Sequence, residues 1–523
     1  MKRRTHTHEP LRFVTATSLF DGHDASINIM RRILQDMGAE VIHLGHNRSV
    51  SEITRAAVQE GAHAVAVSSY QGGHLEFFKY LVDLLREQGC GYVKVFGGGG
   101  GVIVPHEIRE LEDYGVTKIY SPEDGRAMGL TGMVRHMMEC TSEVAIPVVP
   151  LDARLITSQD PVIMGRLIGM AERAHTLHDA SFDPMRAFLA GLARKVPVLG
   201  VTGTGGSGKS SIIDELLRRL LGRYPDKTFA VVSVDPTRSR SGGALLGDRI
   251  RMNALSDERI FMRSMATRAS SRELSDAIGD AIACLKAGGF DMVIVETSGI
   301  GQGDTAVAEV SDLSVYVMTA EYGAPSQLEK IDMLDIAHVV LINKFEQERS
   351  MDALKHVRKQ YQRNHGLFDR SLDDMPVIGT TASRYDDPGM DRAFAVIANM
   401  IAEKGFDGWK YTAVPEVNYE ESRCGVVPSS RRHYLAEVAR SVRDYHAKTL
   451  KTAECVRKID AIERLLEDGP DDGLARALKK RLTEIRKSVT TDYIGLLKSW
   501  EALSGRYRAK TYTYTARDKK IQV

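Results

Sequence analysis

The sequence has 523 residues, of which 43% are hydrophobic and 27% are charged, and its formal net charge is +1. This composition is typical of globular proteins, and a length prior of about 150 residues per domain predicts roughly three domains. The near-neutral charge gives no reason to expect nucleic acid or a membrane as a partner. Neither a signal peptide nor a membrane-spanning run is recognised, and the five cysteines have no metal-ligand spacing. We therefore expect a cytoplasmic protein with free thiols.

Strand-like and helix-like segments alternate five times in the first part of the chain. Short β-branched runs such as 11–18 and 62–69 are separated by amphipathic stretches such as 25–38 and 74–88. Strands joined by helices pair in parallel and are covered by helices on both faces. The pattern predicts a flavodoxin-like, doubly wound α/β domain over residues 1–145.

The rest of the chain divides into three segments with different sequence patterns. Residues 146–195 show few strand signals and predict a helical connector. Alternation resumes over 196–406 with six strand-like runs, which predicts a second doubly wound parallel-sheet α/β domain. Residues 407–523 carry heptad-like apolar positions among many charges, which predicts an α-helical hairpin or small bundle. The final residues alternate like a lone edge strand that lacks a sheet.

A glycine-rich motif marks the start of the second domain. "GTGGSGKS", residues 203–210, fits G-x-x-x-x-G-K-[ST], follows a predicted strand and precedes a predicted helix. In such a loop the backbone N–H groups face phosphates, Lys209 reaches the β- and γ-phosphates, and Ser210 ligates Mg²⁺. The alternative is a turn that only joins strand to helix. The expected nucleotide-binding residues of this loop are Gly206, Ser207, Gly208, Lys209, Ser210 and Ser211.

The base is expected to be guanine. "LINKFE" ends a predicted strand and places Asn343, Lys344, Phe345 and Glu346 in an order similar to the guanine-reading N-K-x-D of GTPases. A carboxylate accepts hydrogen bonds from both N–H groups on the guanine Watson–Crick edge, and adenine cannot offer them. The segment 379–383, "GTTAS", lies where a further base-contacting loop is expected. A solvated charge cluster at the strand end is the alternative.

Further acidic residues follow two other strands of this domain. Asp235 ends one strand, Asp248 comes thirteen residues later, and Glu296 and Thr297 end another strand. Carboxylates at the ends of strands beside a phosphate loop are well placed for Mg²⁺. Each acid taken separately is as well explained as a loop cap.

These segments together resemble the MeaB-type GTPases, the chaperones of adenosylcobalamin-dependent acyl-CoA mutases. The resemblance rests on "VDPTRSRSGGALLGDRIRM" and "VETSGIGQGD" within residues 196–406. We expect catalytic roles for Lys209, Asp248 and Glu296, and the resemblance implies Arg251 as a nucleotide contact. It implies partner-sensing roles for Gln327 and Lys330 in "YGAPSQLEK". The magnesium-site residues that it implies are Ser210, Asp235, Asp248, Glu296 and Thr297.

An early histidine resembles the cobalt-binding histidine of B12 proteins. Asp21, Gly22 and His23 match the start of the family pattern D-x-H-x-x-G, although Ser26 replaces the final glycine. Such an imidazole lies on a loop at the carboxyl end of the sheet and is oriented by a neighbouring carboxylate. A surface histidine that caps a helix is the alternative. The cobalamin-binding residues expected are Asp21, Gly22, His23, Ser68, Gly72, Gly73, Gly97 and Gly98.

The domain order resembles the N-terminal half of the fused isobutyryl-CoA mutases, without the substrate barrel. The resemblance implies GTP or GDP, Mg²⁺ and adenosylcobalamin as ligands, and a GTP-hydrolysing chaperone as the function. The implied partners are the catalytic large subunit of a mutase, an adenosyltransferase and a second copy of the chain. Three alternatives stay open: the B12-binding and GTPase part of a mutase, a GTPase-coupled corrinoid sensor, and a regulator whose first domain is vestigial.

Overall fold

The protein is described by a computed structural model in two compact units, Met1–Arg423 and Cys424–Val523. The described residues are 9–238, 240–268, 274–297, 299, 305–323, 328–329, 331–347, 349–411, 414–417, 419, 433–489, 491–516 and 519–523. Within them, no helix has the length and apolar character needed to cross a membrane.

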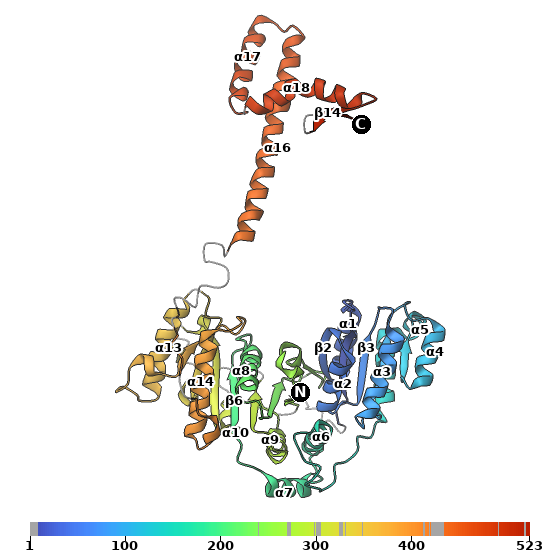
Figure 1. Ribbon diagram of the computed structural model, residues 1–523, viewed down its shortest axis with the longest axis vertical. Helices are drawn as coiled ribbons and strands as arrows, with labels where there is room; N and C mark the ends of the chain where they lie inside the picture. Colours follow the sequence, from blue (N-terminus) through green and yellow to red (C-terminus); the bar gives the residue numbers. More distant parts are fainter. Residues whose placement is uncertain are drawn as a thin grey trace. The chain divides into compact units, whose positions relative to one another are not determined.

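The first sheet has six parallel strands in the order β5-β4-β3-β1-β2-β8 (Figure 1). The strands are β1 (Arg12–Ser18), β2 (Glu40–Arg48), β3 (Ala64–Ser68), β4 (Lys94–Gly98), β5 (Lys118–Tyr120) and β8 (Ala244–Leu246). The helices between them are α1 (Ala25–Asp36), α2 (Val50–Gln59), α3 (His74–Glu87), α4 (Pro105–Tyr114) and α5 (Pro122–Ser142).

Helices cover both faces of this sheet, as predicted. Successive residues of β1 point to opposite faces, so Phe13 packs in a core with α1 and α5, and Val14 packs in a core with α2, α3 and α4. The five expected strands are confirmed. The sixth strand, β8, was not predicted, because it is three residues long and comes from the segment assigned to the second domain.

The second sheet has seven parallel strands in the order β13-β12-β11-β6-β10-β7-β9. They are β6 (Val198–Gly203), β7 (Phe229–Asp235), β9 (Ile260–Ala266), β10 (Met292–Glu296), β11 (Leu313–Thr319), β12 (Val339–Asn343) and β13 (Val377–Gly379). The expectation of six strands was wrong by one. Arg263 interrupts the apolar run of β9 in the sequence, yet it is buried there and paired with Glu172.

Helices also cover both faces of the second sheet. Those that follow its strands are α8 (Lys209–Arg223), α9 (Ile278–Ala287), α10 (Ala306–Val310), α12 (Met333–Ile336), α13 (Ser350–Asn364) and α14 (Pro388–Glu403). The connector forms α6 (Pro161–Leu177) and α7 (Asp183–Leu192), which pack with α9 on one face. The 3₁₀ turns are η1 (Arg249–Arg251), η2 (Ala254–Ser256), η3 (Ala320–Tyr322), η4 (Leu372–Asp374) and η5 (Asp407–Trp409).

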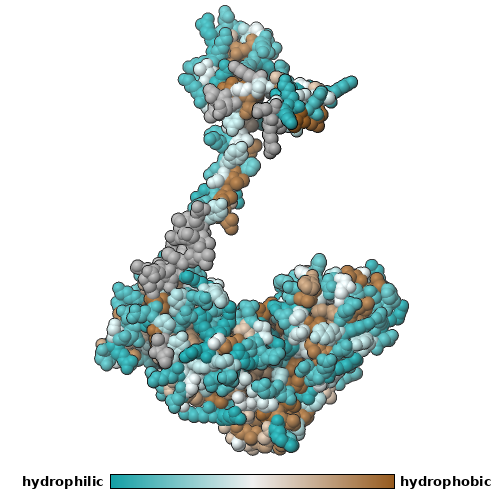
Figure 2. All heavy atoms as spheres, in the orientation of Figure 1, coloured by the Kyte–Doolittle hydropathy of each residue, from teal (hydrophilic) through white to brown (hydrophobic). Residues whose placement is uncertain are grey.

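The second unit is mainly helical, as predicted. It contains α16 (Tyr434–Glu467), α17 (Asp472–Arg486), α18 (Thr491–Arg508), β14 (Thr513–Ala516) and β15 (Lys519–Gln522). The expectation of a lone edge strand was wrong, since β14 and β15 pair as an antiparallel hairpin. α16 packs on α17 near Ile459. The first half of α16 instead exposes the apolar side chains of Leu435, Val438 and Val442. Figure 2 shows hydrophobic residues along this helix.

Candidate functional site

The loop after β1 holds His23 in a defined orientation. The side chain of Asp21 is buried and accepts hydrogen bonds from the His23 backbone N–H at 2.9 Å and from the His23 ring Nδ1 at 2.8 Å. Its second oxygen accepts the Tyr70 N–H at 2.5 Å. Burial opposes ionisation of Asp21, but these hydrogen bonds outweigh it and lower the pKa of the carboxyl. Nδ1 therefore donates to Asp21 and Nε2 is left to bind a metal, on a side chain that is 77% exposed.

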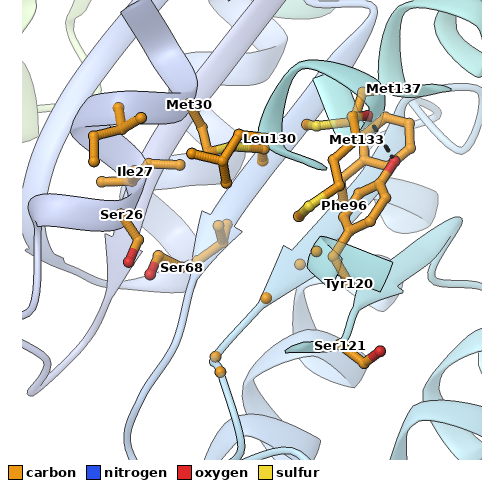
Figure 3. A pocket seen from close by; sticks show the side chains of 18 of the residues that line it. Ser26, Ile27, Met30, Ser68, Phe96, Tyr120, Ser121, Leu130, Met133 and Met137 are labelled. Atoms are coloured by element: carbon orange, nitrogen blue, oxygen red, sulfur yellow. Dashed lines mark hydrogen bonds between the residues drawn. The ribbon is translucent and has the colours of Figure 1, made fainter. Parts of the chain in front are cut away.

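A cavity of about 300 Å³ opens next to this loop, at the carboxyl ends of β3 and β4. Its walls are mainly apolar. Figure 3 shows Phe96, Tyr120, Met133 and Met137 on one side of it, and Ser26 and Ser68 on the other side. Tyr70 joins the cavity to the histidine loop, because its hydroxyl bonds Ser26 at 2.8 Å and its backbone bonds Asp21.

The structure brings part of the expected cobalamin-binding set together. Ser68, Gly97 and Gly98 line the cavity, and Asp21 and His23 lie beside it. Gly22, Gly72 and Gly73 are exposed and do not line the cavity. The sequence analysis did not identify the apolar residues of α5 that line the cavity, although they recur at helical spacing. These residues are Leu130, Met133 and Met137.

The cavity has the features that the nucleotide tail of a cobalamin needs. Its apolar walls suit a flat aromatic base. The Ser68 hydroxyl is buried without a hydrogen-bond partner among the described atoms, so it is free to bond one polar atom of a ligand. A Cβ on Gly98 would lie 3.6 Å from the nearest protein atom, and because Gly98 lines the cavity, a larger side chain there would take up cavity space. The described residues therefore fit the cofactor.

The phosphate loop runs from β6 into α8, as the motif predicted. Gly206 and Gly208 have φ angles of 75° and 95°, which favour glycine. A Cβ on Gly208 would also lie 2.3 Å from the Asn343 side-chain amide, so this position excludes other residues. The Lys209 Nζ donates to the Gly203 and Thr204 carbonyls at 3.0 and 3.3 Å.

Two hydroxyls of this loop have the character of phosphate ligands. Thr204 Oγ1 and Ser207 Oγ are buried and have no hydrogen-bond partner among the described atoms. Buried polar groups are normally satisfied, so an anion with several oxygen acceptors suits this loop. Ser211 is half-buried on the first turn of α8.

Ser210 lies among the expected magnesium-site carboxylates. Its hydroxyl donates to Glu296 at 2.8 Å and lies 3.3 Å from Asp248, and Ser233 bonds the other oxygen of Asp248. Burial and the negative charge of Asp248 raise the pKa of Glu296 to about 8 and that of Asp235 to about 7. Carboxyl groups that resist ionisation together are relieved by a cation between them.

Ser210 and the carboxylates beside it can supply the protein ligands of a magnesium site that a nucleotide completes. No group of three or more His, Cys, Asp or Glu side chains is arranged to hold a metal in the described part of the chain. Mg²⁺ in nucleotide sites is usually held by one or two protein oxygens together with phosphates and water. Ser210 with one neighbouring carboxylate satisfies that requirement.

Some expected residues lie elsewhere or outside the described residues. The Thr297 hydroxyl donates to Thr202 on β6 at 2.7 Å, so it does not face the carboxylates. Arg251 pairs with Asp248 in this structure. Gln327 and Lys330, expected to sense a partner, lie outside the described residues.

The predicted guanine site joins three separate segments. The Asn343 side-chain N–H donates to the Ser207 carbonyl of the phosphate loop at 2.8 Å. Its Oδ1 accepts the Ala382 N–H at 3.1 Å and the Thr380 hydroxyl at 3.4 Å. The segment 379–383 is therefore beside Asn343, as the sequence indicated.

The remaining residues of this motif complete the edge of the site. Lys344 has a φ of 57°, and the buried Phe345 ring lies 4.8 Å from the Tyr419 ring. Glu346 is exposed and borders a recess with Thr381 and Asp387. Its carboxylate is thus accessible to a ligand at the carboxyl end of β12.

Two family models match the chain. Residues 11–124 match the B12 binding domain, and residues 164–406 match the methylmalonyl Co-A mutase-associated GTPase MeaB. A fused isobutyryl-CoA mutase of Geobacillus kaustophilus is 50% identical, covering 98% of this chain and 48% of that protein. One from Cupriavidus metallidurans is 48% identical, covering 98% and 47%.

Similarity also extends to proteins that are described as GTPases. A putative GTPase of Pyrococcus horikoshii is 41% identical over 152 residues, which are 29% of this chain and 47% of that protein. The chain spans about half the length of the fused mutases that it matches. It therefore combines a B12-binding domain with a MeaB-type GTPase domain, and is homologous to the fused isobutyryl-CoA mutases over that half of their length.

Proposed function

We propose that this chain hydrolyses GTP with Mg²⁺, holds adenosylcobalamin at His23, and acts as the G-protein chaperone of an acyl-CoA mutase. The observation that carries the nucleotide half is the bond from Asn343 to Ser207, because it joins the base-reading strand end to the phosphate loop. The oriented imidazole of His23 carries the cobalamin half. Both lie in the unit Met1–Arg423.

The phosphate loop supports hydrolysis through fixed positive charge. The Lys209 ammonium group is held inside the loop by the Gly203 and Thr204 carbonyls. It would neutralise negative charge that develops on the phosphates during hydrolysis. Ser210, with Asp248 and Glu296 beside it, would hold Mg²⁺, which supplies a second positive charge next to the phosphates. Asp235 is the remaining candidate for this metal, since its carboxylate accepts the N–H of Gly247, the residue before Asp248, at 3.1 Å.

The residues around His23 would bind and orient the cobalamin. Adenosylcobalamin supplies a cobalt–carbon bond that breaks to give the radical used in mutase rearrangements. His23 would bind cobalt through Nε2, while Asp21 holds Nδ1 and fixes the tautomer. The cavity with the Ser68 hydroxyl would take the nucleotide tail of the cofactor.

The proposed partner is the catalytic large subunit of an adenosylcobalamin-dependent mutase. The support is the fused relatives, which are about twice as long as the matched region. An adenosyltransferase and a second copy of the chain belong to the same proposal. Mutase activity on mixing the chain with a catalytic subunit would favour this role over a corrinoid sensor.

Nucleotide preference tests the proposal directly. We expect GTP to be hydrolysed at least about tenfold faster than ATP at subsaturating concentration, because a site built for guanine leaves its carboxylate unpaired with adenine. Lys209→Ala should abolish most hydrolysis. Glu346→Gln should reduce the preference, whereas Glu403→Gln, an exposed glutamate at the end of α14, serves as the matched control. Equal turnover of GTP and ATP by the wild type would refute the guanine assignment.

A further inference from the structure

The segment that carries Asp248 is attached to the first sheet. β8 lies two residues before Asp248 and pairs in parallel with β2, with Leu245 opposite Val41. The Ala244 N–H donates to the Ala39 carbonyl at 3.2 Å. β8 is thus an edge strand of the B12-binding sheet, although the flanking strands β7 and β9 belong to the GTPase sheet.

The residues just before β8 fit closely against the same domain. The Ser241 hydroxyl donates to the Gln35 carbonyl at the end of α1, at 2.9 Å. A Cβ on Gly243 would lie 2.1 Å from the Gln35 carbonyl oxygen and 2.8 Å from that of Ala39. The backbone of the B12-binding domain therefore leaves no room for a side chain at Gly243.

The residue just after Asp248 is also fixed by that domain. Arg249 is buried, and its guanidinium lies 3.1 Å from the Glu60 carboxylate and donates to the Gln59 side chain at 3.0 Å. Glu60 itself accepts the Ser264 N–H of β9 at 2.9 Å. A buried ion pair of this kind is costly to break, because one charge is then left without a partner.

Asp248 is therefore held from both sides by the B12-binding domain. Its carboxylate, in turn, faces Ser210 and Ser233 in the nucleotide site. By contrast, Asp235 and Glu296 are positioned by strands of the GTPase sheet itself. One of the three carboxylates at the nucleotide site thus takes its position from the neighbouring domain.

We propose that Glu60 and the β2–β8 pairing are positioning elements for Asp248, so that the B12-binding domain sets the Mg²⁺ affinity of the nucleotide site. This inference rests on the proposed Mg²⁺-dependent nucleotide binding. Residues behind a metal ligand typically change metal affinity by about 10- to 100-fold when altered, because the ligand loses its fixed position. By linkage, Mg²⁺–nucleotide binding would also favour the conformation of the B12-binding domain in which β8 is paired.

Gly243→Ala tests the proposal by inserting a methyl group between β8 and the B12-binding domain. We expect the Mg²⁺ concentration for half-maximal binding of a fluorescent GDP analogue to rise by about tenfold. Binding of the analogue without Mg²⁺ should stay unchanged, whereas general unfolding would weaken both. Gly279→Ala is the matched control, because a Cβ there meets no atom within 4 Å.

Glu60→Gln provides an independent test by removing charge without removing bulk. It should also raise the Mg²⁺ requirement, while Asp280→Asn should not, since Asp280 on α9 is likewise ion-paired but its partners are Arg186 and His175. Wild-type Mg²⁺ dependence in folded Gly243→Ala and Glu60→Gln proteins would overturn this inference and leave the proposed function intact. A wild-type chain without Mg²⁺-dependent nucleotide binding would overturn both.

Discussion

Asp21 fixes the position of His23 through three hydrogen bonds. One of its oxygens holds both the backbone and the ring of His23, and the other is fixed by the Tyr70 backbone after β3. The ring orientation is therefore set by a buried carboxylate that links the loop after β1 to the segment after β3. A histidine that merely capped the start of α1 would need no such carboxylate, and the Asp24 N-cap makes no side-chain cap bond.

Gly98 provides a test of the cavity at the residue scale. Gly98→Leu should lower cobalamin affinity by about tenfold or more, because the added side chain fills space that the ligand needs. Gly101→Leu is the control, since a Cβ there meets nothing within 4 Å and Gly101 does not line the cavity. Calorimetric titration with a cobalamin measures the difference, and equal affinities in the two variants would argue against this cavity as the tail site.

At the scale of elements, regular strands and loops with a motif were predictable from sequence. β1 to β5 follow β-branched runs, and the phosphate loop has its strand, turn and helix in order. β9 was missed because buried Arg263 depends on Glu172, a partner 91 residues away in the chain. β8 was missed because its pairing depends on an edge of another sheet.

Within the site, positions were easier to predict than orientations. Asp248, Glu296 and Ser210 gather as the motif order indicated. Thr297 turns to Thr202 because adjacent residues leaving a strand point in opposite directions. The apolar cavity wall needed knowledge of how α5 packs on β4 and β5, which no local pattern contains.

A buried histidine directly before β3 has a consequence for stability. Burial and the nearby Arg12 charge lower the pKa of His63 to about 4, and its Nδ1 accepts the Arg12 backbone N–H at 3.1 Å. An unfolded histidine titrates near about 6.5, so the unfolded chain binds more protons between these values. Stability should therefore fall as the pH is lowered from about 6.5 to about 4.

His63→Asn should reduce this loss, because the amide oxygen keeps an acceptor for Arg12 and does not titrate. Urea unfolding midpoints measured across this pH range test the expectation. The exposed His106→Asn serves as the control. An unchanged slope in His63→Asn would show that this residue does not contribute to the acid sensitivity.

At the scale of the whole molecule, buried charges join the two α/β domains of the unit Met1–Arg423. Arg12 on β1 pairs with Glu172 of the connector helix α6 at 3.0 Å and donates to the Ser264 carbonyl of β9 at 3.0 Å. Glu172 also pairs with Arg263. Removing one member of such a network leaves a buried charge without its partner, which lowers the free energy of unfolding by about 3–5 kcal/mol. The B12-binding and GTPase domains therefore share one buried ionic network.

His23 is proposed to supply a nitrogen ligand to cobalt, in a chain that is also proposed to bind GTP. Cob(II)alamin bound to protein labelled with ¹⁵N-histidine tests it by electron paramagnetic resonance. We expect each cobalt line to split into a doublet in the labelled wild type, and we expect labelled His23→Ala to lack this doublet. A triplet that persists in the labelled protein would mean that the cofactor's own ¹⁴N base stays on cobalt, and would rule out His23 as the cobalt ligand.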